Sequence, residues 1–339
     1  MAIALGTRGL LVAASLLFVS TTGAWAQDVA APRGPLVHTY SIVARDAATG
    51  EMGVAVQSHW FSVGSIVTWA EAGVGAIATQ SFVEPAYGYK GLQLMKGGVA
   101  AREALAQLVA ADAGRDGRQV AFVDAQGRVA AHTGAKAIAA AGHHTGAQYA
   151  VQANMMASDK VWPAMAAAFE SATGDLATRM LAALSAAQSV GGDIRGKQSA
   201  ALLIVKGTST QQPWAGADRV FDLRVEDHPD PIAELTRLVR LQRAYTHANT
   251  GDARFTEGRI DDALREYAAA TRYAPEILEL PFWQAVTLAA SGRVAEAEPI
   301  FRRVFEKEPQ WADLVPRLPP AGLLPNDAAL VTRIVALRK

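Results

Sequence analysis

Two segments near the C-terminus of this 339-residue chain repeat each other at an offset of 34 residues. The residue pairs that recur at this offset are Gly258 and Gly292, Arg259 and Arg293, Ala263 and Ala297, Tyr267 and Phe301, and Pro275 and Pro309. The period is typical of tetratricopeptide helix–turn–helix units, which bury their apolar faces by stacking and need about three copies for stability. With two clear copies, the sequence predicts an all-α helical-repeat tail over residues 232–339 that packs against the preceding domain or a second chain.

Residues 39–231 follow a different pattern, in which short apolar strands are joined by tight turns. Strands are predicted at 40–45, 52–57, 66–69, 75–79, 119–124, 129–133, 149–155, 200–205 and 220–225. Helices are predicted at 87–95, 100–111, 159–172 and 176–189. Because short turns join most neighbouring strands, this order favours an α+β layered sandwich over a doubly wound parallel sheet.

The N-terminus has the pattern of an export signal. Arg8 is the only early charge, residues 10–19 form a continuous apolar run, and residues 24–26 (Ala-Trp-Ala) have the form that signal peptidase cleaves. The run is shorter than the ~20 residues of a stable membrane-spanning helix. We therefore expect a signal peptide over 1–26, a flexible leader over 27–38, and a periplasmic or secreted mature chain with no membrane association. An uncleaved N-terminal anchor is the alternative.

Composition excludes several classes of function. Lysine and arginine together number 32, as do aspartate and glutamate, and nucleic acid is therefore not expected as a partner, because its phosphates are bound by a basic excess. The absence of cysteine excludes disulfides, thiol nucleophiles and thiolate metal sites. No P-loop or Gly-x-Gly-x-x-Gly motif follows a predicted strand, and we expect neither a cofactor nor a metal.

Six sequence motifs occur in order along residues 38–229. They are HTYSIVARD at 38–46, GVAVQS at 53–58, AGVGAIATQ at 72–80, QAN at 152–154, GDIRGKQSAA at 192–201 and DLRVEDHP at 222–229. Together they resemble an uncharacterised bacterial family, domain of unknown function 1028, over about residues 39–231. That family is regarded as similar to N-terminal nucleophile hydrolases. The resemblance implies a four-layer αββα sandwich for residues 39–231, in agreement with the layered arrangement inferred above.

The resemblance places Thr39 at the first residue of the first strand, where the nucleophile of such hydrolases lies. In that chemistry the free α-amine of the nucleophile acts as the base, and nearby polar groups hold the oxyanion. The candidate catalytic partners of Thr39 are Ser58, Asn154 and Gln198. The candidate substrate-binding residues are Gln80, Glu84, Tyr87 and His228. Signal cleavage leaves the leader in front of Thr39, so its amine becomes free only if the His38–Thr39 bond is also cut. Otherwise Thr39 only begins a strand, a position that β-branching favours.

Other polar clusters have simpler structural explanations. His59 follows Ser58 on a strand, where adjacent side chains point to opposite faces, so the two are not expected to bond. The histidines at 143–144 are expected in an exposed loop rather than at a metal. Asp230 and Pro231 are residue types common at the N-cap and at the first position of a helix, so a helix is expected to begin there. The alternative is that residues 227–230 bind a metal or orient a substrate. The aromatic residues expected to pack in the core are Trp60, Phe61 and Trp69, with a place beside a binding cleft as the alternative.

Two functions are compatible with these observations. The first is an exported amidohydrolase of the N-terminal nucleophile type that acts on a small amide or peptide-like substrate. The second is a non-catalytic protein that binds a small-molecule or peptide-like ligand in the cell envelope. In both, the helical repeats would bind a protein partner or form a homodimer.

Overall fold

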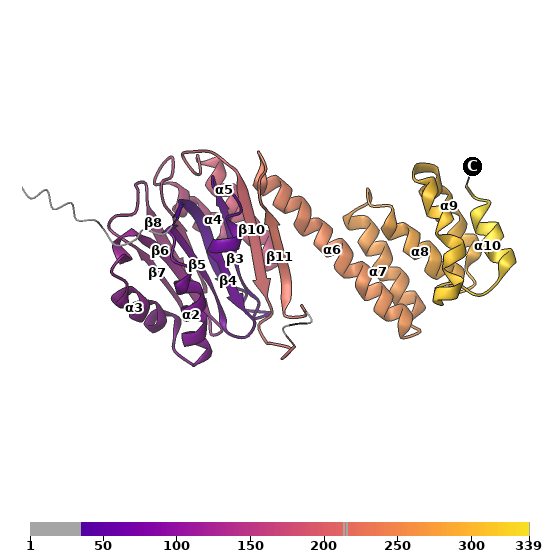
Figure 1. The fold of residues 1–339 in the computed structure, drawn as a ribbon, viewed down its shortest axis with the longest axis horizontal. Coiled ribbons are helices and arrows are strands. Elements are labelled where there is room, and N and C mark those ends of the chain that lie inside the picture. The colour runs from indigo at the N-terminus through magenta and orange to yellow at the C-terminus, as the bar shows by residue number, and fades with distance from the viewer. Residues whose placement is uncertain (1–34, 213, 215, 339) are drawn as a thin grey trace, which may run out of the picture. The chain divides into compact units, whose positions relative to one another are not determined.

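Two antiparallel sheets precede an all-helical region in the computed structural model, which describes residues 35–212, 214 and 216–338 (Figure 1). The predicted signal peptide and residues 27–34 of the predicted leader lie outside the described residues. The mixed α+β class with antiparallel sheets and a helical C-terminal region is confirmed. Within the described residues, no helix is both long enough and apolar enough to cross a membrane.

The first sheet has five strands. In chain order they are β1 (Leu36–Val37), β4 (Thr68–Glu71), β5 (Gly75–Phe82), β6 (Arg118–Asp124) and β7 (Val129–Thr133). The spatial order is β1-β5-β6-β7, and β4 also pairs with β5. Strand β5 therefore pairs with β6 along its length on one side and with the short strands β1 and β4 on the other.

The second sheet has six strands in the order β11-β10-β3-β2-β9-β8. Their bounds are β2 Thr39–Arg45, β3 Met52–Ser58, β8 Gly142–Gly146, β9 Tyr149–Ala153, β10 Ser199–Val205 and β11 Arg219–Val225. The predicted hairpin of β2 and β3 turns at Asp46, whose Oδ1 accepts hydrogen bonds from the backbone nitrogens of Ala48 and Thr49, both at 2.9 Å. This turn sets the register that places Thr39 opposite Ser58.

An apolar core lies between the two sheets, and helices cover their outer faces. Val43 and Val54 of the second sheet meet Ala78 and Val123 of the first in this core. Alternate residues of the same strands face the helices, because successive side chains of a strand point to opposite faces. Thus Ile42, next to Val43, packs on the helix side.

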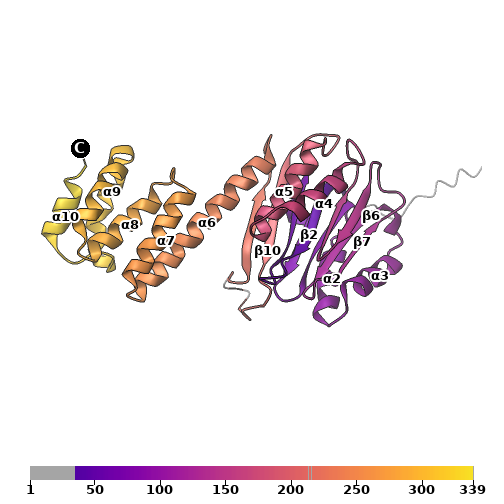
Figure 2. The same cartoon turned by 180° about the vertical axis from the view of Figure 1, so that it is seen from behind.

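Helices α2 to α5 form most of these outer layers, and the first turns of α6 (Pro231–Thr256) also pack on the second sheet through Ile232, Leu235 and Val239. On the first sheet are α2 (Ala86–Lys96) and α3 (Ala101–Ala111), and on the second are α4 (Val161–Ser171) and α5 (Leu176–Ser189). Figure 2 shows α4 and α5 lying over the strands of the second sheet. Aromatic and long aliphatic side chains, Phe122 on one sheet and Leu202 on the other, are fully buried under these helices.

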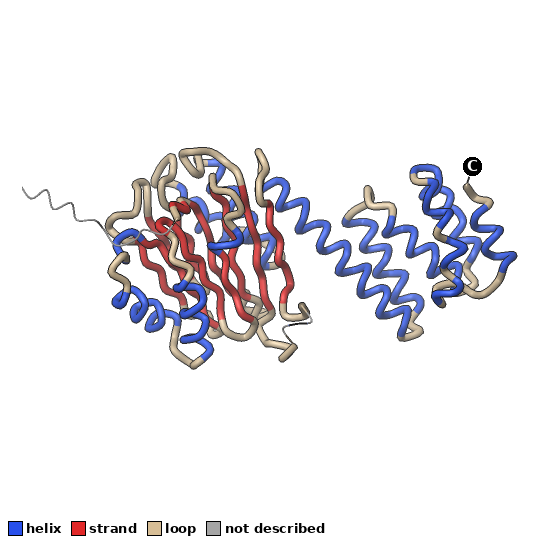
Figure 3. Tube along the Cα trace, in the orientation of Figure 1, coloured by secondary structure: helices blue, strands red, loops and turns tan. Residues whose placement is uncertain are grey.

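The C-terminal region is built from antiparallel helices, which Figure 3 separates clearly from the strands. Their bounds are α6 Pro231–Thr256, α7 Ile260–Tyr273, α8 Glu279–Ala290, α9 Val294–Lys307 and α10 Ala328–Val335, with 3₁₀ turns η3 Pro309–Asp313, η4 Val315–Arg317 and η5 Pro319–Ala321 before α10. Gly258 and Gly292 end α6 and α8 with φ of 74° and 78°. The two glycines of the repeat therefore adopt the same left-handed conformation, which costs glycine little.

The structure differs from the sequence-based expectations at several places. The strand predicted at 66–69 is the short helix α1 (Gly64–Val67) followed by β4, because an apolar run this short has no distinguishing period. The loop predicted around residues 143–144 is strand β8 at the edge of its sheet, although both histidines are exposed. Phe61, expected in the core, is 63% exposed. Asp230 does precede α6, but its side chain makes no cap hydrogen bond.

Candidate active site

Thr39 and Ser58 form the centre of a buried polar cluster at the end of the β2–β3 pair. Both side chains are fully buried. Thr39 Oγ1 lies 3.0 Å from Ser58 Oγ and 3.0 Å from the carbonyl oxygen of Val37, and its proton can be donated to either. The register of the hairpin is the cause, since it sets the two hydroxyl residues directly opposite each other.

The carbonyl group that precedes Thr39 accepts two short hydrogen bonds. Ser58 Oγ donates to the His38 oxygen at 2.6 Å, and Arg195 Nη2 donates to the same oxygen at 2.6 Å. Asp193, 2% exposed, holds the guanidinium in place through Oδ1 to Nε at 3.0 Å and Oδ2 to Nη2 at 2.7 Å. The His38–Thr39 peptide bond is therefore polarised by a hydroxyl and a fixed cation.

Buried amides surround the other side of Thr39. The Thr39 carbonyl oxygen accepts from Gln80 Nε2 at 3.0 Å and from the Asn154 backbone nitrogen at 3.1 Å. Gln119 Oε1 accepts from both Gln80 Nε2, at 2.7 Å, and Asn154 Nδ2, at 2.8 Å. Because Gln80 and Gln119 belong to one sheet and Asn154 follows a strand of the other, the network links the two sheets around Thr39.

The His38 ring occupies a closed pocket beside this network. The ring is 1% exposed, its Nδ1 lies 2.6 Å from Asn154 Oδ1, and it meets Phe82 edge to face at a centroid separation of 5.9 Å. Burial of the ring, opposed by the Asn154 hydrogen bond and aided by the Arg195 charge, lowers the pKa of His38. The pocket therefore favours a neutral imidazole.

The last part of the predicted flexible leader is an ordered strand. Leu36 pairs with Phe82 and Val37 with Ser81, and Val37 is fully buried in the core between the sheets. The structure thus places Leu36–Val37 in a strand, where the sequence predicted only a leader. A single sequence could not show this, because the pairing depends on the position of β5.

The structure brings together only some of the predicted site residues. Thr39, Ser58, Asn154 and Gln80 lie in one cluster, whereas the side chain of Gln198 donates to Asp227 at 3.1 Å. The Gln198 backbone nitrogen is still bonded to the Ser58 oxygen at 3.1 Å. His228 is exposed, and its Nδ1 accepts from the Asp230 nitrogen. Gln198 and His228 thus flank the cluster without entering it.

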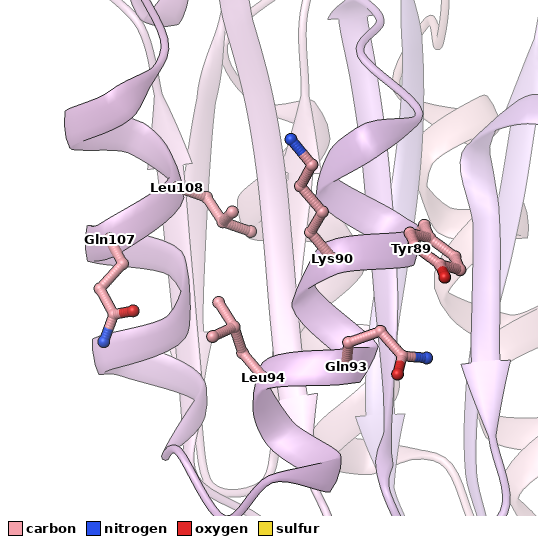
Figure 4. A pocket seen from close by; sticks show the side chains of 6 residues that line it. All are labelled: Tyr89, Lys90, Gln93, Leu94, Gln107 and Leu108. Atoms are coloured by element: carbon pink, nitrogen blue, oxygen red, sulfur yellow. The ribbon is translucent and has the colours of Figure 1, made fainter.

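Glu84 and Tyr87 line a separate hollow of about 220 Å³ between α2 and α3. The Tyr87 hydroxyl donates to Asp112, and burial together with that carboxylate raises the Tyr87 pKa. A second hollow of about 490 Å³ continues along the same two helices (Figure 4) and is lined by Tyr89, Lys90, Gln93, Leu94, Gln107 and Leu108. Lys90 and Leu108 border both hollows, and neither hollow includes a residue of the Thr39 cluster.

Sequence reasoning missed three members of the cluster: Gln119, Asp193 and Arg195. Asp193 and Arg195 lie inside the motif at 192–201. Their spacing, an aspartate two residues before an arginine in a glycine-rich turn, could have indicated an ion pair at the site. Gln119 had no such signal, since it looks like any polar residue on a strand. Among the described residues, no group of three His, Cys, Asp or Glu side chains is placed to hold a metal ion.

Comparisons with known proteins identify the region that carries this cluster. A family model described as a family of unknown function, DUF1028, matches residues 39–235. The crystal structure of protein SPO2555 from Silicibacter pomeroyi, assigned to the same family, is similar to this chain with a TM-score of 0.53 and 30% sequence identity. That similarity covers 59% of this chain and 87% of the other. No curated protein matches.

Proposed function

The chain belongs to the DUF1028 family, and from this premise we propose that it is an exported amidohydrolase whose nucleophile is Thr39. The observation that carries the proposal is the hydrogen-bond chain at the His38–Thr39 bond. Thr39 Oγ1 bonds to Ser58 Oγ, which in turn donates to the His38 carbonyl oxygen. A hydroxyl next to a doubly hydrogen-bonded carbonyl is the arrangement needed to cut that bond and expose a threonine α-amine.

The cut proceeds by transfer of the His38 acyl group from nitrogen to oxygen. Thr39 Oγ1 attacks the His38 carbonyl carbon, its proton passes to Ser58 Oγ, and the Ser58 proton passes to the carbonyl oxygen. Arg195 stabilises the charge that develops on this oxygen. The carbon–nitrogen bond then breaks as this proton moves from the former carbonyl oxygen to the Thr39 nitrogen, which re-forms the carbonyl group and leaves an ester on Oγ1. Water hydrolyses the ester, giving a His38 carboxylate and a free Thr39.

The freed α-amine is the base for the second reaction. An unperturbed α-amine has a pKa of about 8, and a group of this kind can exchange a proton with the Thr39 hydroxyl near neutral pH. Ser58 and Arg195 then face the carbonyl oxygen of an incoming amide in place of the His38 oxygen. Thr39 takes the acyl group, the amine leaves, and water releases the acid.

We extend the proposal to the architecture and the compartment. The two sheets with α2 and α3 on one outer face and α4 and α5 on the other support an N-terminal nucleophile hydrolase-like αββα sandwich. The helix pairs α6–α7 and α8–α9, with equivalent glycines 34 residues apart, support tetratricopeptide-like repeats that bind a protein partner or a second copy. The export pattern at 1–26 supports a periplasmic or secreted location.

Intact-mass measurement of the full chain, purified after export, tests the cut. We expect a species that begins at Thr39 in the parent and in Thr39→Ser, and none in Thr39→Ala. Ser58→Ala should slow the cut by about 10²–10³-fold, the effect of losing one oxyanion donor. Ser65→Ala, which removes an exposed hydroxyl, is the matched control and should cut at the parent rate.

The same measurement can contradict the proposal. Finding every chain at Gln27 and none at Thr39 would leave the α-amine blocked and remove the base. The leader would then be a permanent strand of the first sheet, and non-catalytic binding of an envelope ligand would be the better explanation.

A further inference from the structure

We propose that the space now filled by Leu36–His38 is the acyl-side substrate pocket, and that it selects an extended peptide-like acyl group ending in a neutral, planar, hydrogen-bonding side chain such as that of histidine or asparagine. This inference rests on the proposed function and names its substrate class. The residues before Thr39 lie where the acyl part of a substrate would lie, with their last carbonyl group next to the Thr39 hydroxyl. The His38 carbonyl is the group that the hydroxyl, Ser58 and Arg195 surround.

The backbone of the leader is bound as an added strand. Leu36 and Val37 pair antiparallel with Phe82 and Ser81 of β5, and the Val83 nitrogen donates to the Pro35 oxygen at 3.0 Å. Strand addition of this kind recognises any extended peptide through its main chain, and alternate side-chain pockets then provide selectivity. The edge of β5 is thus suited to a peptide-like substrate rather than to a compact small molecule.

The pocket of the His38 ring sets the main selectivity. Asn154 Oδ1, 2.6 Å from Nδ1, requires a donor on the ligand, and Phe82 provides an aromatic edge contact. The other ring nitrogen, Nε2, is buried and has no hydrogen-bond partner. A carboxylate would meet the Asn154 oxygen without a donor, and a lysine would lose its hydration with no acceptor beyond that amide. The pocket thus provides one acceptor and no counter-charge, so a neutral side chain with a donor, such as an imidazole or a carboxamide, fits it better than either ion.

The two substrate positions before the acyl-end residue, which correspond to Val37 and Leu36, should differ in how strictly they select a side chain. Val37 is fully buried among apolar side chains between the sheets, whereas Leu36 is 46% exposed. Opposite Val37, Ser81 has a φ of 71° and a buried Oγ with no partner. A non-glycine residue in the left-handed region is uncommon and is often found at functional sites. We therefore expect a requirement for a small apolar residue next to the acyl end and tolerance one residue further away.

Arg195 extends the recognition to the product. After hydrolysis the acyl group ends in a carboxylate, and the guanidinium that donated to the His38 carbonyl then faces a negative charge. Charge-assisted hydrogen bonds are stronger than neutral ones. The acid that corresponds to the preferred substrate should therefore bind the cut protein and inhibit it.

Fluorogenic tripeptides test the inference on the full chain after its own processing, with the Thr39 N-terminus verified by mass. The substrates are acetyl-Leu-Val-X-aminomethylcoumarin with X as His, Asn, Ala or Asp. We expect kcat/KM for His and Asn to exceed that for Ala and Asp by at least about tenfold, because the Asn154 oxygen is left unpaired by the latter two. Replacing Leu by Ala in the His substrate should change kcat/KM by less than about threefold, the matched control for an exposed position.

Binding of acetyl-Leu-Val-His acid, measured by calorimetry against acetyl-Leu-Val-Ala acid, gives a readout independent of turnover. Equal rates and equal affinities for the His and Ala compounds would overturn the proposed selectivity while leaving a cut at Thr39 intact. So would a processed chain that neither hydrolyses nor binds any tripeptide. A chain that never begins at Thr39 would overturn the proposed function and this inference with it.

Discussion

The interior of the two-sheet region and the interior of the helical region follow different rules. The sheet region buries a set of fully enclosed polar side chains: Thr39, Ser41, Ser58, Gln80, Gln119, Gln152 and Asn154. In the described part of the helical region, Thr287 is the only buried polar residue. Phe301 there meets Phe282 edge to face and stacks on Phe305 in an apolar core.

This difference indicates that the two interiors have different roles. Burying an amide without a partner costs free energy, so an apolar filling would be the simpler way to join two sheets. The amides near Thr39 instead bond to one another, and together they hold the backbone on both sides of one peptide bond. The core of the helical region has no such requirement and is filled by apolar packing.

Phe301→Ala should have the largest effect on stability. It removes a fully buried ring that contacts Phe282 and Phe305, and such truncations cost about 3–5 kcal/mol. Hydrogen exchange read by mass spectrometry should show faster exchange over residues 279–307 and unchanged exchange over 39–58. Faster exchange in both segments would show that the two interiors are one cooperative unit.

Gln119→Leu should destabilise the sheet region by about 2–4 kcal/mol, although it adds apolar surface. The change leaves the side-chain amides of Gln80 and Asn154 without their shared acceptor. Urea unfolding monitored by exchange of the β5 and β6 amides measures the loss. Gln107→Leu, on the exposed face of α3, is the control and should change stability by less than about 0.5 kcal/mol. A neutral or stabilising Gln119→Leu would mean that the polar interior is dispensable.

Replacing either repeat glycine, Gly258 or Gly292, by alanine should lower the free energy of unfolding by about 1–2 kcal/mol, because both residues have positive φ. A Cβ at either position would meet no other atom, so no steric clash adds to this cost. The penalty is therefore conformational and should be the same for Gly258→Ala and Gly292→Ala. Gly98→Ala, with φ of 90° and equally open surroundings, should cost a similar amount in the sheet region. Unequal effects at Gly258 and Gly292, measured by thermal unfolding, would argue against equivalent repeats.

The stability contribution of His38 should be lost at acid pH. Its pKa is lowered in the folded protein, so between that value and the ordinary 6.5 the unfolded chain binds more protons. The free energy of unfolding should therefore fall as the pH drops below about 6.5, with a slope of at most about 1.4 kcal/mol per pH unit from this group. The comparison is Thr39→Ala against Thr39→Ala with His38→Asn, since the first substitution keeps the leader attached. Parallel pH profiles for the two proteins would show that the ring is not buried as a neutral group.

Features that depend on neighbouring residues could be predicted from the sequence alone. Alternating apolar residues and short turns identified the β2–β3 hairpin and the antiparallel α+β class, and the 34-residue period identified the helical region. These features follow from local spacing, because strand and helix periods are set by the backbone. The motif that contains Thr39 also placed this residue at the beginning of a strand, and β2 does begin there.

Which groups meet at that end of the strand depends on contacts between residues far apart in the sequence. Arg195 reaches the His38 carbonyl across 157 positions of sequence, and Gln119 meets Asn154 from the opposite sheet. The leader became a strand because the edge of β5 was open to it, whereas Gln198 turned toward Asp227. Such contacts depend on how the two sheets pack and on which strand edges remain unpaired. Neither can be inferred from the local spacing of residues in the sequence.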